Sequence, residues 1–202
     1  DGLQFVSPRN QLGGFRGSNN VVRGTKTGAY NVYGDYPEFI QQQPMDILQG
    51  RFINYGDINQ RRKVAVIGEG VIRDLYAPGE NVLGSYIKVQ GINFLIVGVY
   101  KSISNMGGDA EESQKQVFIP FTTFQQAFNY GDVVGWMTIT AKDNVPITDV
   151  KQSVFDLLKQ RHNVDPTDER AIGHFDLYQE FKKINGLFAI LTTVSYVVGI
   201  FI

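Results

Sequence analysis

The chain has 202 residues, of which 19 are Lys or Arg and 20 are Asp or Glu, and its formal net charge is −1. Proteins that bind nucleic acid usually cluster their Lys and Arg residues. The longest basic run here is Arg61-Arg62-Lys63, so the composition argues against that class. We interpret this run as the solvated start of the strand that follows, in preference to a phosphate site. The chain contains no cysteine, which excludes disulfide bonds and thiolate metal sites.

The first 50 residues are predicted to form short strands and one short helix. Gly, Asn and Thr alternate with Val and Tyr near the start, which indicates strands at 15–23 and 28–33 joined by a turn at Gly24–Gly28. Asp35 is a suitable N-cap for a short helix through Gln42, because its carboxylate can accept hydrogen bonds from the backbone N–H groups of a first helical turn. A further strand is expected from Met45 to Gly50.

The middle of the chain carries the clearest strand signals. The continuous apolar run from Lys63 to Ile67 predicts a strand that is buried on both faces. A short helix over Glu69–Tyr76 should follow, ending before a Pro-Gly turn. The alternating segments Tyr86–Gln90 and Asn93–Ser102, separated by Gly91, predict a hairpin.

The segment from Ser104 to Lys115 is polar and has no periodicity, which predicts an exposed, mobile loop. Its Gly and acidic residues would suit calcium chemically, but they lack the regular ligand spacing of an EF-hand, so a solvated hairpin tip is favoured. We treat this loop as a candidate contact for a partner protein. The candidate residues are Asn105, Met106, Gly107, Asp109, Glu111 and Glu112.

Five further elements are expected after this loop. The predicted order is a strand over Gln116–Ile119, a helix over Phe121–Asn129, a strand over Trp136–Lys142, an amphipathic helix over Ile147–His162 and a last strand over Ala171–Phe175. The helix prediction rests on apolar residues at helical spacing with polar residues mostly opposite. Taken together, the elements predict an α+β fold built from short strands.

The C-terminal segment from Ile184 to Ile202 contains no charged residue. As a helix, its roughly 19 residues would rise about 28 Å, close to the thickness of a bilayer core. A buried core helix would normally show a polar face, so we interpret this segment as transmembrane. Asp176, followed three residues later by Gln179, resembles a capping box, which predicts one stiff coupling helix from Asp176 into the membrane. Its interfacial residues would be Tyr178, Phe181, Lys182 and Lys183.

The sequence offers no convincing catalytic, cofactor or metal site. His162 is expected at a helix C-terminus, where a cation is favoured. His174 could act as the base for a serine nucleophile, with Asp176 orienting the imidazole, but no nucleophile turn accompanies them. Gly68-Glu69-Gly70 lies where a dinucleotide loop would begin, yet the third glycine is missing, so a tight strand-to-helix turn is favoured. The chain also lacks a G-x-x-x-x-G-K motif, so any ATP hydrolysis is expected in another domain or subunit.

An ordered series of segments resembles the MacB-like periplasmic core domain of ABC-transporter permeases, in the MacB/FtsX-type permease family. No single segment is specific, but their order and spacing extend over most of the chain. The segments are Pro44-Met45-Asp46-Ile47-Leu48-Gln49-Gly50-Arg51-Phe52 with Asp57, Lys63–Gly68, Leu75-Tyr76, Gly84–Val89, Phe94–Val99, Val117-Phe118-Ile119-Pro120 and Leu157–His162.

The resemblance implies a discontinuous, porter-like α/β subdomain at 1–50 and 115–175. A β-rich, sabre-like subdomain would be inserted at 51–114, and a stalk helix at 176–202 would run into the membrane. It also implies a protein of the bacterial inner membrane whose domain faces the periplasm. Such a permease would work as a dimer with an ATPase subunit or domain, and with a periplasmic adaptor or carrier protein.

The function implied by the resemblance is coupling of cytoplasmic ATP hydrolysis to periplasmic work, either export or mechanical transmission. The cargo would be an antimicrobial peptide, a macrolide-like molecule or another substrate passed through the adaptor. One alternative is a lipoprotein-extracting (LolC/LolE-like) permease domain. An alternative of another class is a membrane-anchored ligand-binding module or enzyme. The chain begins at Asp1 without Met, so we expect it to be a fragment or a processed product.

Overall fold

The structure is a computed structural model that describes residues 2–12, 20–103, 110–176 and 183–184. The chain divides into two compact units, and each is described by itself. The larger unit is Gln4–Thr140, and the smaller comprises Asp1–Leu3 and Ala141–Ile202. The chain therefore passes between the units at two places, one in its first strand and one in its last.

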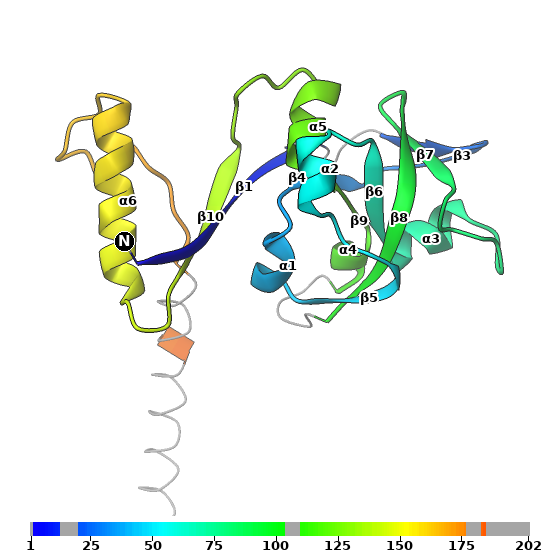
Figure 1. The fold of residues 1–202 in the computed structure, drawn as a ribbon, viewed down its shortest axis with the longest axis horizontal. Helices are drawn as coiled ribbons and strands as arrows, with labels where there is room; N and C mark the ends of the chain where they lie inside the picture. The colour runs from blue at the N-terminus through cyan, green and yellow to red at the C-terminus, as the bar shows by residue number, and fades with distance from the viewer. Residues whose placement is uncertain (1, 13–19, 104–109, 177–182, 185–202) are drawn as a thin grey trace, which may run out of the picture. The chain divides into compact units, whose positions relative to one another are not determined.

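Ten strands of the described residues form one mixed sheet (Figure 1). The order across the sheet is β10-β1-β4-β9-β6-β8-β7-β2-β3, and β5 pairs with β8. The pairs β4–β9 and β6–β8 are parallel, and the other registered pairs are antiparallel. The strands are β1 (Leu3–Leu12), β2 (Val21–Arg23), β3 (Lys26–Gly28), β4 (Asn31–Asp35), β5 (Met45–Gly50), β6 (Val64–Gly68), β7 (Tyr86–Val89), β8 (Ile92–Ser102), β9 (Gln116–Pro120) and β10 (Trp136–Ala141).

Among the described residues, five short helices belong to the larger unit and one long helix to the smaller. They are α1 (Phe39–Gln42), α2 (Tyr55–Asn59), α3 (Glu69–Leu75), α4 (Ala110–Gln114) and α5 (Phe121–Ala127) in the larger unit, and α6 (Ile147–Arg161) in the smaller. The mixed α+β architecture agrees with the predicted fold class.

The central strands are buried on both faces, because successive side chains of a strand point to opposite sides. Along β6, Ala65 and Ile67 pack into one apolar cluster, while Val66 packs into the other. The first cluster also contains Leu75 of α3, and the second also contains Phe39 of α1. All five residues of β6 are buried, which confirms the burial predicted from the apolar run.

The predicted hairpin is also confirmed. β7 pairs antiparallel with β8 through the register Val89↔Ile92. The two-residue turn between them places Gln90 at φ 44° and Gly91 at φ 86°. Positive φ at both central positions is the type I′ geometry that matches the twist of a hairpin.

Predictions for the N-terminal region were the least accurate. The first strand, β1, was missed, and the strand expected over 28–33 is divided between β3 and β4. The other expected strand, 15–23, is described only from residue 20 on, where β2 covers Val21–Arg23. Asp35 ends β4 and is fully buried. It is not a helix cap, because α1 begins only at Phe39, with Glu38 as its N-cap residue.

Strands from the predicted insert at 51–114 share the sheet with strands from both flanking segments. β6 and β8 lie within 51–114, and β9, which follows the insert, pairs with both β6 and β4. The division into porter-like and sabre-like subdomains therefore stays a prediction. If it holds, the two subdomains share one continuous sheet.

In the smaller unit, α6 confirms the amphipathic helix. Val150 is its buried residue, but Leu157 of the predicted apolar stripe remains 49% exposed. The strand expected at 171–175 is wrong, because this segment is irregular. Its His174 ring lies 5.2 Å from that of Phe155, and its Nε2 lies 3.2 Å from Nζ of Lys151.

Most of the predicted coupling helix and transmembrane segment lies outside the described residues, including Tyr178, Phe181, Lys182 and 185–202. Asp176 is not in a helix, and its carboxylate lies 3.4 Å from Nζ of Lys151. Lys183 and Ile184 are helical and exposed. Among the residues that the structure describes, no helix is long and apolar enough to cross a membrane.

Candidate functional site at the sheet edge

The two strands that carry the chain between its units are neighbours in the sheet. β1 and β10 lie side by side, and β10 is the terminal strand of the sheet (Figure 1). The points at which the chain passes between units are Leu3–Gln4 in β1 and Thr140–Ala141 in β10. A displacement of either strand would therefore act on the same edge of the larger unit.

A buried ion pair anchors β1 to the sheet. Arg9 of β1 donates from Nε and Nη2 to Oδ2 of Asp35, at 3.1 and 2.9 Å. Arg9 is 8% exposed and Asp35 is fully buried. The guanidinium carbon of Arg9 also lies 3.7 Å from the ring centroid of Tyr33 and 3.8 Å from that of Phe39. Such cation–π contacts compensate part of the cost of removing the cation from water.

The environment of Asp35 has opposing effects on its pKa. Burial raises the pKa to about 6, and the charge and hydrogen bonds of Arg9 act in the opposite direction. Oδ1 of Asp35 has no hydrogen-bond partner among the described residues, which is consistent with a carboxylate that is incompletely compensated for its loss of water.

We expect this raised pKa to appear as a pH dependence of stability. Between its ordinary value of 3.8 and about 6, the folded chain holds more protons on Asp35 than the unfolded chain. The contribution of Asp35 to the free energy of unfolding therefore falls as the pH rises through this window. Asp35→Asn removes the titration, so the stability of the unmodified chain relative to the variant should fall by on the order of 2 kcal/mol from pH 4 to pH 7. Urea unfolding of both chains measures this difference, and a difference that does not vary with pH would contradict the raised pKa.

The side chain of Asn10, in β1, forms hydrogen bonds to the turn that precedes β10. Its Nδ2 donates to the Val133 carbonyl at 2.9 Å, and its Oδ1 accepts from the Gly135 N–H at 2.6 Å. The same Gly135 N–H lies 3.1 Å from the Arg9 carbonyl. Asn10 is fully buried, and its amide uses both its donor and its acceptor here. This side chain therefore ties together the two segments that lead to the crossings between the units.

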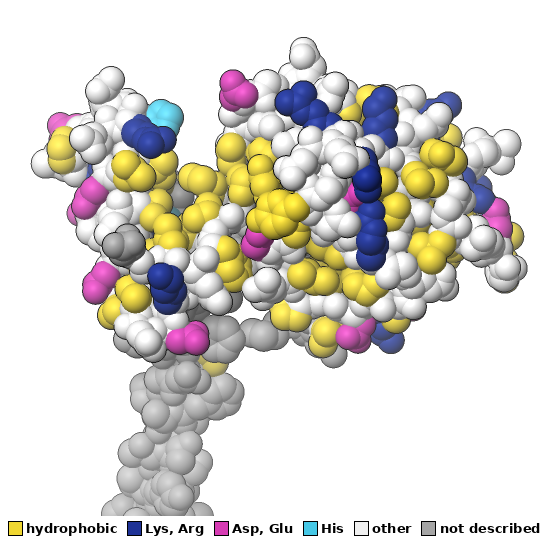
Figure 2. Space-filling view, viewed as in Figure 1, with side chains coloured by type: hydrophobic (Ala, Val, Ile, Leu, Met, Phe, Trp, Pro, Cys, Tyr) yellow, Lys and Arg dark blue, Asp and Glu magenta, His cyan; other side chains and the backbone are white. Residues whose placement is uncertain are grey.

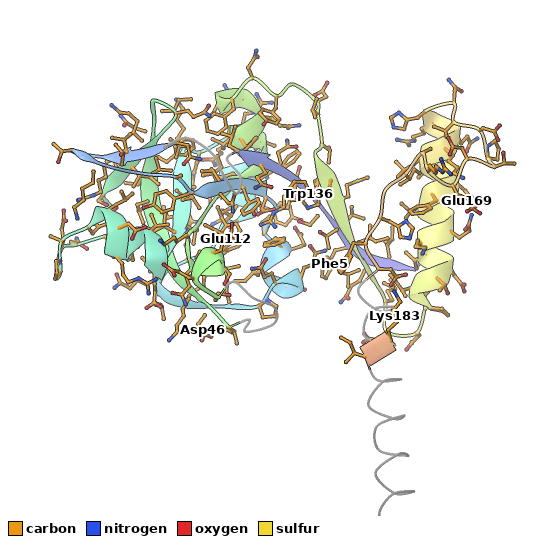
Figure 3. The ribbon with its side chains drawn as sticks, turned by 180° about the vertical axis from the view of Figure 1, so that it is seen from behind. Phe5, Asp46, Glu112, Trp136, Glu169 and Lys183 are labelled. Carbon is orange, nitrogen blue, oxygen red and sulfur yellow. The ribbon has the colours of Figure 1, made fainter. Side chains whose placement is uncertain are left out.

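The outer strand β10 is exposed and apolar at its start. Its Trp136 and Met137 are each 43% exposed, and Val133 and Val134 before it are 56% and 41% exposed. Trp136 nevertheless contacts the surroundings of the Arg9–Asp35 pair. Its ring packs edge-on against that of Tyr33, with 6.3 Å between the ring centroids. Figure 3 shows Trp136 on β10 and Phe5 on neighbouring β1.

A second charged cluster follows β5. Asp57 of α2 is fully buried and accepts from both terminal nitrogens of Arg51, at 2.5 and 2.9 Å. Asn54 and Asp57 form a reciprocal capping box at the start of α2, and Arg62 lies 3.6 Å away. Burial opposes ionisation of Asp57, but these hydrogen bonds and cations outweigh it and hold the pKa below its ordinary value. The cluster fixes the geometry of the Gly50-Arg51-Phe52 segment.

The family model of the MacB-like periplasmic core domain matches residues 4–156. The chain belongs to this family. It is 25% identical to the macrolide export ATP-binding/permease protein MacB of Bdellovibrio bacteriovorus, over 98% of this chain and 30% of that protein. It is 28% identical to the pyoverdine export ATP-binding/permease protein PvdT of Pseudomonas putida, over 72% of this chain and 22% of that protein. The chain thus spans less than a third of the length of either relative.

Two solved structures share the fold. The periplasmic region of MacB from Actinobacillus actinomycetemcomitans aligns with a TM-score of 0.68 and 24% identity, covering 81% of this chain and 69% of that one. The extracellular domain of the ABC-type transporter YknZ from Gram-positive bacteria aligns with a TM-score of 0.69 and 14% identity, covering 82% of this chain and 79% of that one. The chain therefore has the fold of these two domains.

The structure brings together only part of the predicted contact loop of this core domain. Asn105, Met106, Gly107 and Asp109 lie outside the described residues. Glu111 and Glu112 lie in α4 (Figure 3 labels Glu112), where the sequence had indicated a loop. Glu111 pairs with Lys115 at 3.2 Å, and Glu112 accepts from Nδ2 of Asn31 at 3.3 Å. The acidic residues of α4 are therefore engaged with the core domain itself.

Gly68, at the junction of β6 and α3, allows close packing of the chain. β6 ends at Gly68 and α3 begins at Glu69, which leaves no loop that could enclose a pyrophosphate. A Cβ on Gly68 would lie 2.1 Å from the Gln114 carbonyl oxygen, so the glycine is needed for close approach of the chain. No group of three His, Asp or Glu side chains suited to a metal occurs among the described residues.

Proposed function

We propose that this core domain is the extracytoplasmic part of an export permease and passes on movement that ATP hydrolysis drives on the cytoplasmic side. The observation that carries the proposal is the position of the two crossings between the units, which lie in the adjacent strands β1 and β10. The Asn10 hydrogen bonds and the Arg9–Asp35 pair connect these strands firmly to the sheet. Movement of the smaller unit would reach the larger unit through this edge.

The names of the relatives support export as the type of work, since both are ATP-binding/permease proteins, one for macrolides and one for pyoverdine. We propose that this permease acts in the bacterial inner membrane as a dimer, with an ATPase subunit or domain and a periplasmic adaptor or carrier. In this proposal, a helix from Asp176 past Lys183 links the domain to the membrane, and the segment 104–115, which includes α4, contacts the adaptor or carrier.

The mechanical connection between the two units can be tested by making the linking chain flexible. We propose inserting four Gly/Ser residues at both crossings of the full-length permease, between Gly2 and Leu3 before β1 and after Ala141 at the end of β10. Such inserts are flexible coils, so movement should no longer reach β1 or β10. We expect most of the export to be lost, because flexible coils absorb a displacement that continuous strands would transmit. The ATPase rate should persist.

The matched control places the same insert between Gly131 and Asp132, in an exposed turn of the larger unit. This insert does not lie between the units, so export should be retained. Melting of the two isolated domains should show that both inserts leave the fold intact. Normal export with flexible inserts at both crossings would refute the proposed coupling.

A further inference from the structure

A basic hollow lies between the turn after α2 and helix α5. It has a volume of about 230 Å³ and is lined by Arg61, Lys63, Ile92, Thr123, Gln126 and Ala127. No acidic residue is among the lining residues. Arg61 and Lys63 are both exposed, and neither has an ion-pair partner among the described residues. Two cations thus face a concave surface without compensation.

The backbone at Arg61 is unusual for an arginine. The turn is a Schellman motif, in which the Arg62 N–H donates to the Asp57 carbonyl at 3.0 Å and the Arg61 N–H to the Ile58 carbonyl at 3.3 Å. Arg61 occupies the left-handed position of this motif, with φ 50°. Glycine is the usual residue there because it lacks the Cβ penalty. Arg61 therefore has a strained backbone conformation, and strain of this kind tends to occur at functional sites.

Neighbouring elements hold the hollow rigid. Thr123 Oγ1 of α5 donates to the Arg62 carbonyl at 2.9 Å, and the Leu95 N–H of β8 donates to the Lys63 carbonyl at 2.9 Å. Thr123 is 2% exposed, so its hydrogen bond is shielded from water. The two cations therefore extend from a fixed backbone, which lowers the ordering cost for any partner that binds them.

The positive charge continues beside the hollow. Arg51 and Arg62 flank Asp57, and their side chains are 40% and 47% exposed, whereas the carboxylate between them is fully buried. With Arg61 and Lys63, these residues amount to four cations against one anion. Figure 2 shows Lys and Arg side chains gathered on this face of the larger unit. The chain as a whole has a net charge of −1, so the charge is distributed asymmetrically.

We propose that this hollow is a docking site for an acidic segment of a partner protein. Carboxylates of the segment would pair with Arg61 and Lys63, and Gln126 offers a hydrogen-bonding amide beside them. Ile92 and Ala127 supply an apolar floor for the carbon chains of the glutamates. The long-range field of the four cations would increase the rate of association and make it sensitive to salt. This inference does not depend on the export function, because binding is measured on the chain alone.

The test uses the 202-residue chain and a fluorescein-labelled hexaglutamate peptide, with binding followed by fluorescence polarisation. The double variant Arg61→Gln/Lys63→Gln should weaken binding about 3- to 10-fold, as expected for the loss of two exposed charge pairs. The control Lys88→Gln removes an exposed cation on β7, away from the hollow, and should change the affinity less than about twofold. Raising the salt concentration should weaken binding to the unmodified chain.

A second variant separates binding from folding. Arg61→Gly relieves the left-handed arginine, so the melting temperature should rise by about 2–4 °C. The same change should weaken peptide binding about threefold. Loss of affinity in a more stable chain supports a binding role for Arg61, whereas unchanged affinity in both Arg61 variants overturns the proposal.

Three further outcomes would also overturn it. Complete displacement of the peptide by millimolar inorganic phosphate would indicate a site for a free anion. Binding to phosphatidylglycerol vesicles that is lost in the double variant would indicate that the hollow meets a membrane surface. Self-association that disappears in the double variant would indicate that a second copy of this chain covers the hollow.

Discussion

Replacing Asp35 with alanine is expected to lower the free energy of unfolding by about 3–5 kcal/mol at pH 7. The substitution leaves the Arg9 guanidinium buried beneath the rings of Tyr33 and Phe39 with no carboxylate to compensate its charge. Removing one partner of a buried pair typically has an effect of this size. Equilibrium unfolding in urea, followed by circular dichroism, measures the change.

The matched control removes both charges. In Arg9→Met/Asp35→Leu, no uncompensated charge remains, so much of the lost stability should return. The contrast between the two variants distinguishes a paired charge from simple loss of packing. A double variant that is less stable than Asp35→Ala would show that the pair is not the main source of the effect.

Phe118→Ala should be similarly disruptive, with a loss of about 3–5 kcal/mol. Phe118 of β9 is fully buried. Its ring centroid lies 5.2 Å from that of Tyr100, 5.7 Å from Phe52, 5.8 Å from Phe39 and 5.9 Å from Tyr33. Truncation would leave a cavity between four aromatic rings that belong to two strands, a helix and a connecting segment, so the site cannot collapse easily.

Phe175→Ala is the matched control, because Phe175 is 79% exposed and its truncation should change stability by no more than about 0.5 kcal/mol. Both variants can be compared by the same urea titration. A loss below about 1 kcal/mol for Phe118→Ala would mean that the aromatic cluster can repack, contrary to the close packing of the two-sided core.

Some elements were predictable because their signals are local. The apolar run of β6 indicates burial on both faces by itself, and the hairpin of β7 and β8 is specified by alternation around Gly91. Helix α6 follows from helical spacing of its apolar residues. In each case the residues that carry the signal are close together in the chain.

The resemblance of ordered segments gave the correct family, but it did not give the role of each residue. Asp57 was recognised only as an acidic residue that follows Gly50-Arg51-Phe52. Its capping box and its contacts with Arg51 and Arg62 depend on how the chain folds back after β5. The basic run at Arg61 was correctly expected to be solvated, whereas the hollow beside it depends on where α5 packs.

The anchor of β1 was decided by tertiary structure alone. Locally, Asp35 is as suitable for a helix N-cap as for a buried ion pair, and the segment around Arg9 does not alternate like a strand. Arg9 can be buried only because Asp35, 26 residues later, and two aromatic rings meet it. The sequence by itself determined the central strands, the hairpin and the family, since these depend on nearby residues. The edge of the sheet at which the chain crosses between its units could not be predicted in this way. It forms because β1 pairs with β4 and β10, which lie far from it in the sequence.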